Sequence, residues 1–244
     1  MSKSTAGTLS SAARGELSGR SLPSRSRSTG SVSVARVSTA VDPVRRERPG
    51  KVAIMRAAVT VMGEDGYEGA SMRDMATRAG VSVAALYYHF PSKHDLLREF
   101  LDEAYDVLLD RLERRLADAD PAAVAQLDEV VSTLIASYLH DHFAQMASNV
   151  ALREYTRLNP PERAAIDAKR QRLLEIAESV VVAGVETGDF TVPDAREAAR
   201  VVITLSSSLV EPFPQMGRSL ADVIELYQSF ARAIVMGVPG VCSS

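Results

Sequence analysis

A run of polar aromatic side chains about a third of the way along the chain can bind nucleic acid. Tyr87, Tyr88 and His89 are consecutive, and Lys93 follows closely. Their hydroxyl, imidazole and ammonium groups donate hydrogen bonds to phosphate oxygens. The residues just before them are small and apolar, suited to meeting a thymine methyl group or a base edge: Val83, Ala84 and Ala85.

Core packing is the alternative role for the two tyrosines. Adjacent positions on a helix are rotated by about 100° from each other. Tyr87 and Tyr88 therefore cannot both face inward, which favours contact with a partner such as DNA.

The elements that must position these residues are marked by caps and breakers. Ser71 with Asp74 forms a capping pair that starts a helix, and Gly80 ends it. Ser82 starts a second, very short helix that Pro91 terminates. Residues 71–90 thus read as a helix-turn-helix, with these side chains predicted in its core: Met75, Ala76, Ala79, Val81, Leu86 and Phe90.

Two further helices are predicted to flank this motif. The first carries an apolar stripe that includes Ile54, Ala58 and Val61 and ends at Gly66. The second opens at Ser92 with Asp95 and continues past Leu112.

Residues 48–108 resemble the DNA-binding domain of the TetR family of bacterial transcription regulators. The resemblance rests on Gly66-Tyr67, residues 71–76, residues 79–82 and residues 86–93, with Asp95-Leu96-Leu97 behind them. It implies sequence-specific binding to double-stranded DNA by a regulator, most commonly a repressor of a palindromic operator. Added to the physical roles of the side chains, it assigns DNA contact to Ser71, Arg73, Ser82, Val83, Ala84, Ala85, Tyr87, Tyr88, His89 and Lys93.

One dipeptide departs from the family pattern. Many relatives carry Lys-Gly where this chain has Val83-Ala84. A phosphate-contacting charge and a close-approach glycine are missing, so Arg73, His89 and Lys93 are expected to carry more of the electrostatic attraction.

The rest of the chain is predicted to be helical, giving an all-α protein in which residues 109–244 form a ligand-binding and dimerisation domain. Two of its helices, 194–210 and 220–236, are expected to form the homodimer interface, because apolar residues cover more than one face of each. A simple role in the core is the alternative for both. The predicted helices of this domain are 122–146, 149–157, 162–187, 194–210 and 220–236.

A small-molecule effector is expected between the long helices of residues 92–187. The candidate ligand-binding side chains are Tyr138, His142, Arg153 and Tyr155, polar groups in otherwise apolar segments. Residues 169–172 and 182–194 weakly resemble family members that control lipid or steroid catabolism in actinobacteria. That likeness implies an acyl-CoA thioester as one candidate effector.

Charge is distributed unevenly along the 244 residues. The net charge of −3 combines +6 in residues 1–50, zero in residues 51–100 and −9 in the remainder. Residues 1–47 are rich in Ser and Arg and are expected to be disordered. One hypothesis is that arginines of this basic segment reach along an adjacent DNA groove: Arg25, Arg27, Arg36, Arg45, Arg46 and Arg48. The alternative is that the segment is a solvated linker or results from a mis-assigned start codon.

Other function classes find little support. The single Cys242 excludes a disulfide framework, and no nucleophile elbow, phosphate loop, metal spacing or membrane-spanning run occurs. We therefore expect a cytoplasmic, nucleoid-associated regulator that is not an enzyme and has no bound cofactor. An activator, or a helical interaction module with a degenerate helix-turn-helix, remains the alternative.

Overall fold

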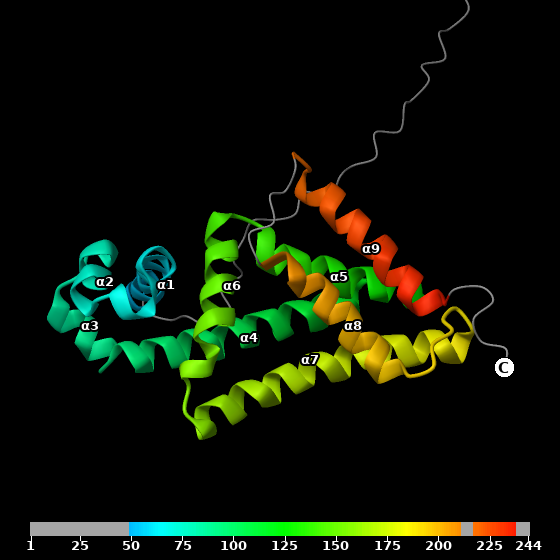
Figure 1. Ribbon diagram of the computed structural model, residues 1–244, viewed down its shortest axis with the longest axis horizontal. Helices are drawn as coiled ribbons and strands as arrows, with labels where there is room; N and C mark the ends of the chain where they lie inside the picture. Colours follow the sequence, from blue (N-terminus) through cyan, green and yellow to red (C-terminus); the bar gives the residue numbers. More distant parts are fainter. Residues whose placement is uncertain (1–48, 211–216, 238–244) are drawn as a thin grey trace, which may run out of the picture. The chain divides into compact units, whose positions relative to one another are not determined.

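The computed structural model describes residues 49–210 and 217–237, and within these ranges the chain is helical and contains no strand (Figure 1). The predicted all-α class is confirmed. The Ser/Arg-rich tail of residues 1–47, the segment around Pro212 and Pro214, and Cys242 lie outside the described residues.

The first four helices build the reading head, a name used here for residues 49–92 with the start of α4. They are α1 (Pro49–Gly69), α2 (Met72–Ala79), α3 (Val83–His89) and α4 (Lys93–Asp118). The predicted core of the helix-turn-helix is confirmed: Met75, Ala76, Leu86 and Phe90 are buried against α1, and Ala79 and Val81 pack beside them. This burial holds α2 and α3 on α1.

The remaining helices form the body. They are α5 (Ala123–Leu139), α6 (His142–Glu154), α7 (Pro160–Thr187), α8 (Ala195–Ser207) and α9 (Leu220–Met236), with 3₁₀ turns at Tyr155–Arg157 and Ser208–Val210. The apolar faces of α5, α7, α8 and α9 enclose a second core, which α4 enters through Leu108 and Leu112. The apolar side of α6, with Val150, packs instead into the core of the head. Asp128 of α5 accepts a hydrogen bond from Arg232 Nε of α9 at 2.8 Å.

No break in the chain marks the predicted domain boundary at residue 108, which falls inside α4. Phe100 and Leu101 of that helix belong to the core of the head, and Leu108 and Leu112 belong to the core of the body. One continuous helix therefore joins the two.

The predicted helix at 122–146 is wrong in one respect, because α5 ends at Leu139 and a new helix begins at His142. Asp141 is the cause: its backbone is extended, and its carboxylate accepts the Ala144 N–H at 2.7 Å as an N-cap. As a result, α6 includes most of the segment predicted as a separate helix at 149–157.

The predicted end of the first helix at Gly66 is confirmed: this glycine is left-handed, with φ at +72°, and a short helical segment follows it to Gly69. Two other predicted boundaries shift. The helix predicted at 162–187 begins at Pro160, because Asn159 and Glu162 form a capping box. The segment 194–210 ends as a 3₁₀ turn, whereas 220–236 is found as predicted.

Gly184 gives a test of core packing in the body. A Cβ added at this residue would lie 2.6 Å from Cγ of the Phe190 ring, which is itself buried. We expect Gly184→Ala to lower the free energy of unfolding by about 1–3 kcal/mol, as overpacking does. Urea unfolding measures this.

Gly69→Ala is the matched control, because its Cβ would meet only Asp65 Cβ at 3.4 Å. It should change stability by less than about 1 kcal/mol. Equal effects of the two substitutions would contradict the packing seen at Phe190.

Candidate nucleic-acid interface

Each helix of the motif begins at a serine N-cap. The Ser71 hydroxyl accepts the Asp74 N–H at 3.2 Å, and the Ser82 hydroxyl accepts the Ala85 N–H at 3.1 Å. Between the helices, Gly80 adopts a left-handed conformation with φ at +68°. The predicted caps and turn are thus present, and α3 leaves the turn in a defined direction.

α3 separates its side chains into a buried face and an exposed face. Leu86 lies in the core, whereas Tyr87 is 49% exposed and Tyr88 is 77% exposed. Core packing is therefore excluded for both tyrosines. His89 is half-buried, and its ring makes an edge contact with Tyr88 at 5.4 Å between centroids.

The small residues predicted to meet base edges lie mostly on the exposed face. Ser82, Val83 and Ala84 are exposed, and Ala85 is half-buried beside them. With the tyrosines they form a surface that combines apolar contacts with hydroxyl donors. Such a surface is suited to base edges and the phosphates flanking them.

Most cations of the reading head are engaged within the protein. Lys93 Nζ donates to the carbonyl oxygens of Tyr67 and Ala70, the latter at 3.0 Å, and lies 4.3 Å from the Tyr67 ring centroid. Lys93 thus holds the end of α1 in place, a role that the sequence pattern did not indicate. Its predicted phosphate contact would have to use the remaining N–H.

Arg78 and Arg73 lie on the same short helix and differ in their surroundings. Arg78 pairs with Glu64, and this hydrogen bond lowers the pKa of the Glu64 carboxyl, so the pair stays charged at neutral pH. The exposed guanidinium of Arg73 has no partner among the described residues. Arg73 is therefore the better placed of the two to contact phosphate.

α6 and the 3₁₀ turn after it pack against α1 at several points along its length. Met146 of α6 fits against Gly63, where an added Cβ would lie 2.6 Å from the Met146 sulfur. The Arg56 guanidinium of α1 stacks on Phe143 at 4.0 Å. Arg157 pairs with Glu68 at 2.6 Å and stacks on Tyr67 at 4.6 Å. We call this α1–α6 contact the seam.

Sequence reasoning missed the seam. Its one signal was Gly63 inside an otherwise regular helical pattern, which is a hint of close packing.

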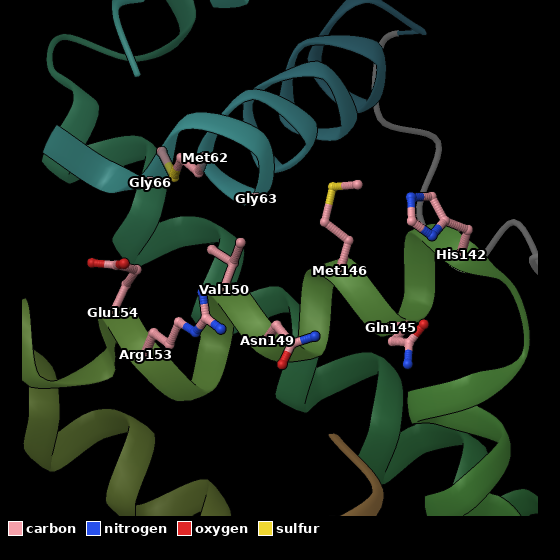
Figure 2. A pocket seen from close by; sticks show the side chains of 10 residues that line it. All are labelled: Met62, Gly63, Gly66, His142, Gln145, Met146, Asn149, Val150, Arg153 and Glu154. Carbon is pink, nitrogen blue, oxygen red and sulfur yellow. The ribbon is translucent and has the colours of Figure 1, made fainter. Parts of the chain in front are cut away.

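A pocket of about 270 Å³ opens at the seam between α1 and α6. Figure 2 shows the labelled side chains of α6 in a row beside α1, with Met146 reaching toward α1. His142 and Arg153, two of the predicted effector-binding residues, line this pocket.

The other two predicted effector-binding residues do not line this pocket. The Tyr155 hydroxyl donates to Asp167, and the Tyr155 ring faces Arg170 at 5.1 Å. Tyr138 packs against the core of the body near Tyr105. Burial raises the pKa of both the Tyr138 and Tyr105 hydroxyls, and the nearby charge of Arg170 partly offsets this.

The helices predicted to form the dimer interface each bear an exposed apolar side chain. Ala198 and Val202 of α8, and Val223 and Val235 of α9, are buried in the core of their own chain. Val201 is 41% exposed and Phe230 is 45% exposed. These exposed residues are available for contact with a second copy.

The described ranges contain neither a candidate metal site nor a candidate membrane span. Among residues 49–210 and 217–237, no group of three or more His, Cys, Asp or Glu side chains is placed to hold a metal ion. None of the helices in those ranges is long and apolar enough to cross a membrane.

Comparison with known proteins matches both parts of the chain to family models. The model for bacterial regulatory proteins of the tetR family matches residues 54–100. The model for the tetracyclin repressor-like C-terminal domain matches residues 120–235. Together they cover about two thirds of the chain.

Individual relatives are similar over most of their length. The fatty acid metabolism regulator protein of Bacillus subtilis (strain 168) is 24% identical over 196 residues, which span 80% of this chain and 98% of the relative. A tetR-family regulatory protein from Rhodococcus RHA1 superposes with a TM-score of 0.71 at 22% identity, covering 79% of this chain and all of that chain.

AibR in complex with isovaleryl coenzyme A and operator DNA superposes with a TM-score of 0.65 at 21% identity, covering 77% of this chain and 98% of that chain. These three likenesses extend through the head and the body.

Arg73 and Arg78 give a matched test of the interface. We expect Arg73→Gln to weaken binding to duplex DNA at all sequences and to reduce the slope of log affinity against log salt by about one, because one phosphate contact is lost. Arg78→Gln, which removes an already paired charge from the same helix, should leave the slope nearly unchanged. A larger loss of slope for Arg78→Gln would contradict this assignment. Fluorescence anisotropy at several salt concentrations measures both.

Proposed function

Since the chain belongs to the TetR family of bacterial transcriptional regulators, we propose that this DNA-binding regulator is a ligand-responsive repressor that binds a palindromic operator as a homodimer. It acts in the cytoplasm, at the nucleoid. The observation that carries the proposal is the capped helix-turn-helix that leaves Tyr87 and Tyr88 exposed on α3 while Leu86 anchors that helix.

In this proposal α3 enters the major groove and α2 lies against the backbone. The contacts divide by chemistry. Arg73, Ser71 and the tyrosine hydroxyls bind phosphates, and Val83, Ala84 and Ala85 meet base edges. Ser82, His89 and Lys93 lie at the edge of the same surface and contribute further contacts to DNA.

Dimerisation places two heads on two half-sites. We assign the interface to α8 and α9, where Val201 and Phe230 are exposed apolar residues on adjacent helices of the body. Removing such side chains from water favours association by about 25 cal/mol for each Å² buried.

The effector we propose is an acyl-CoA thioester. AibR, a structural neighbour, is seen with isovaleryl coenzyme A. In this chain Tyr105 and Tyr138 bring hydroxyl groups to the apolar interior formed by α4, α5 and α7, and Arg170 contributes a positive charge near both. An acyl chain suits the interior, and the phosphates of coenzyme A suit the arginine.

The seam is the proposed route from effector to DNA. Binding in the body shifts α6, and α6 moves α1 because Met146 is seated against Gly63 and Arg157 is paired with Glu68. The response requires that the effector bind one arrangement of the heads more tightly than the other.

Sequence selection with genomic fragments tests the DNA-binding proposal. We expect enrichment of one palindromic site, and a reporter gene behind that site should be repressed in cells that express the full chain. Activation of the reporter would instead show that the protein is an activator. Failure to enrich any palindrome would overturn the proposal in favour of an interaction module with a degenerate helix-turn-helix.

Gly63 and Met146 test the route through the seam. We expect Gly63→Ala to weaken operator affinity roughly tenfold, since residues in contact couple by about 0.5–3 kcal/mol. Its added methyl group displaces Met146 and shifts α1. The double variant Gly63→Ala/Met146→Ala removes the clash and should recover most of the loss.

Operator affinity of the wild type and both variants is measured with and without isovaleryl-CoA and palmitoyl-CoA. The route would be contradicted if Gly63→Ala left both affinity and response unchanged, or if the second substitution gave no recovery.

A further inference from the structure

One face of α6 carries a stripe of hydrogen-bonding side chains that the proposed function does not use. His142, Gln145, Asn149 and Arg153 recur every three or four residues, which places them on a single side of the helix. All four line the pocket at the seam (Figure 2). The stripe spans about 16 Å, given the rise of 1.5 Å for each helical residue.

These polar groups are not engaged with the rest of the protein. Gln145 and Asn149 are half-buried, yet their side chains have no hydrogen-bond partner among the described residues, and the same holds for the guanidinium of Arg153. Arg157 and Arg78 close by are each paired with a carboxylate. Unlike these paired arginines, the side chains of the stripe are therefore available to bind a ligand.

The charge of the pocket is positive once the internal ion pairs are set aside. Its one acidic lining residue, Glu154, is engaged by Arg157. Glu64, which lies near His142, is engaged by Arg78. The uncompensated cation is Arg153, so the ligand that fits this site is an anion.

The rest of the pocket lining is apolar. Met146 and Val150 of α6 and Met62 of α1 supply apolar atoms, and Gly66 of α1 leaves open space where a side chain would stand. At about 270 Å³ the pocket lies just below the usual range of small-molecule sites. A compact ligand with a short alkyl part therefore suits it better than a bulky or purely inorganic one.

We propose that the seam pocket is a second binding site, which takes a small alkyl carboxylate. Arg153 binds the carboxylate through its two parallel N–H groups, and Asn149 or Gln145 donates a further hydrogen bond. The alkyl chain lies on Met62 and Met146. This site is separate from the interior around Tyr138. Because Gly63 lines it, a bound ligand would also contact the seam, which is the proposed route between body and head.

Direct binding to the full chain tests the site without relying on DNA binding. Hexanoate is the probe, and isothermal titration calorimetry measures its Kd. We expect saturable binding that weakens about tenfold or more in Arg153→Gln, as loss of a bidentate charge-assisted pair does. Asn149→Leu should weaken it by less.

Two control ligands separate the parts of the chemistry. Inorganic phosphate has charge without an alkyl chain, and hexanamide has the alkyl chain without charge. Both should bind at least several-fold more weakly than hexanoate. Equal or tighter binding of either one would overturn the assignment of an alkyl carboxylate.

Two control variants separate the site from other effects. Leu152→Gln changes a residue of α6 that is 60% exposed and does not line the pocket, and Tyr138→Phe changes the interior. Both should leave the Kd for hexanoate unchanged, and thermal unfolding should show Arg153→Gln folded like the wild type. No saturable binding, an unchanged Kd in folded Arg153→Gln, or a loss caused by Tyr138→Phe would each overturn the proposal.

Discussion

The packing of α1 between α2 and α6 is the constraint on which the rest of the structure depends. α2 and α3 are too short to be stable alone, and they are helical because Met75, Leu86 and Phe90 are buried against α1. On another side of α1, Gly63 has no side chain, and Met146 takes the space that a Cβ would occupy. Any displacement of α6 must therefore either move α1 or open a void at residue 63, which would cost stability.

Electrostatics explains why the reading head depends on being held in place. Residues 51–100 carry no net charge, and several of the cations described there are engaged within the protein. Because each phosphate contact adds affinity through counterion release, a head with few available cations binds DNA weakly by itself. Two heads at a fixed separation overcome this weakness, since the second binds at high effective concentration. The arginines of residues 1–47 lie outside the described residues.

Much of the head was predictable from the sequence because its signals are local. The serine caps, the left-handed Gly80 and the apolar spacing identify the elements and their buried faces from a few neighbouring residues. Local signals also conflicted at one position. Asp141 is a good N-cap, but the apolar pattern across it favoured one continuous helix, so the break between α5 and α6 was not predicted. The family resemblance supplied the function, which spacing alone did not.

The seam and its pocket could not be predicted because they depend on residues far apart in the chain. Gly63 and Met146 are separated by more than eighty positions, and Lys93 reaches back to the carbonyl oxygens at the end of α1. His142 and Arg153 were identified as polar residues in an apolar setting, but the sequence predicted the wall opposite them within residues 92–187. The structure places α1 there.

The most direct test of a rigidly held, paired reading head is the dependence of affinity on half-site spacing. Affinity is measured for the selected palindrome and for the same palindrome with five base pairs inserted at its centre, which turns one half-site to the opposite face of the duplex. If the seams fix both heads on a dimeric body, the insertion should reduce affinity to that of an isolated half-site. Full affinity for the altered operator would show that the heads move independently, and would contradict the account.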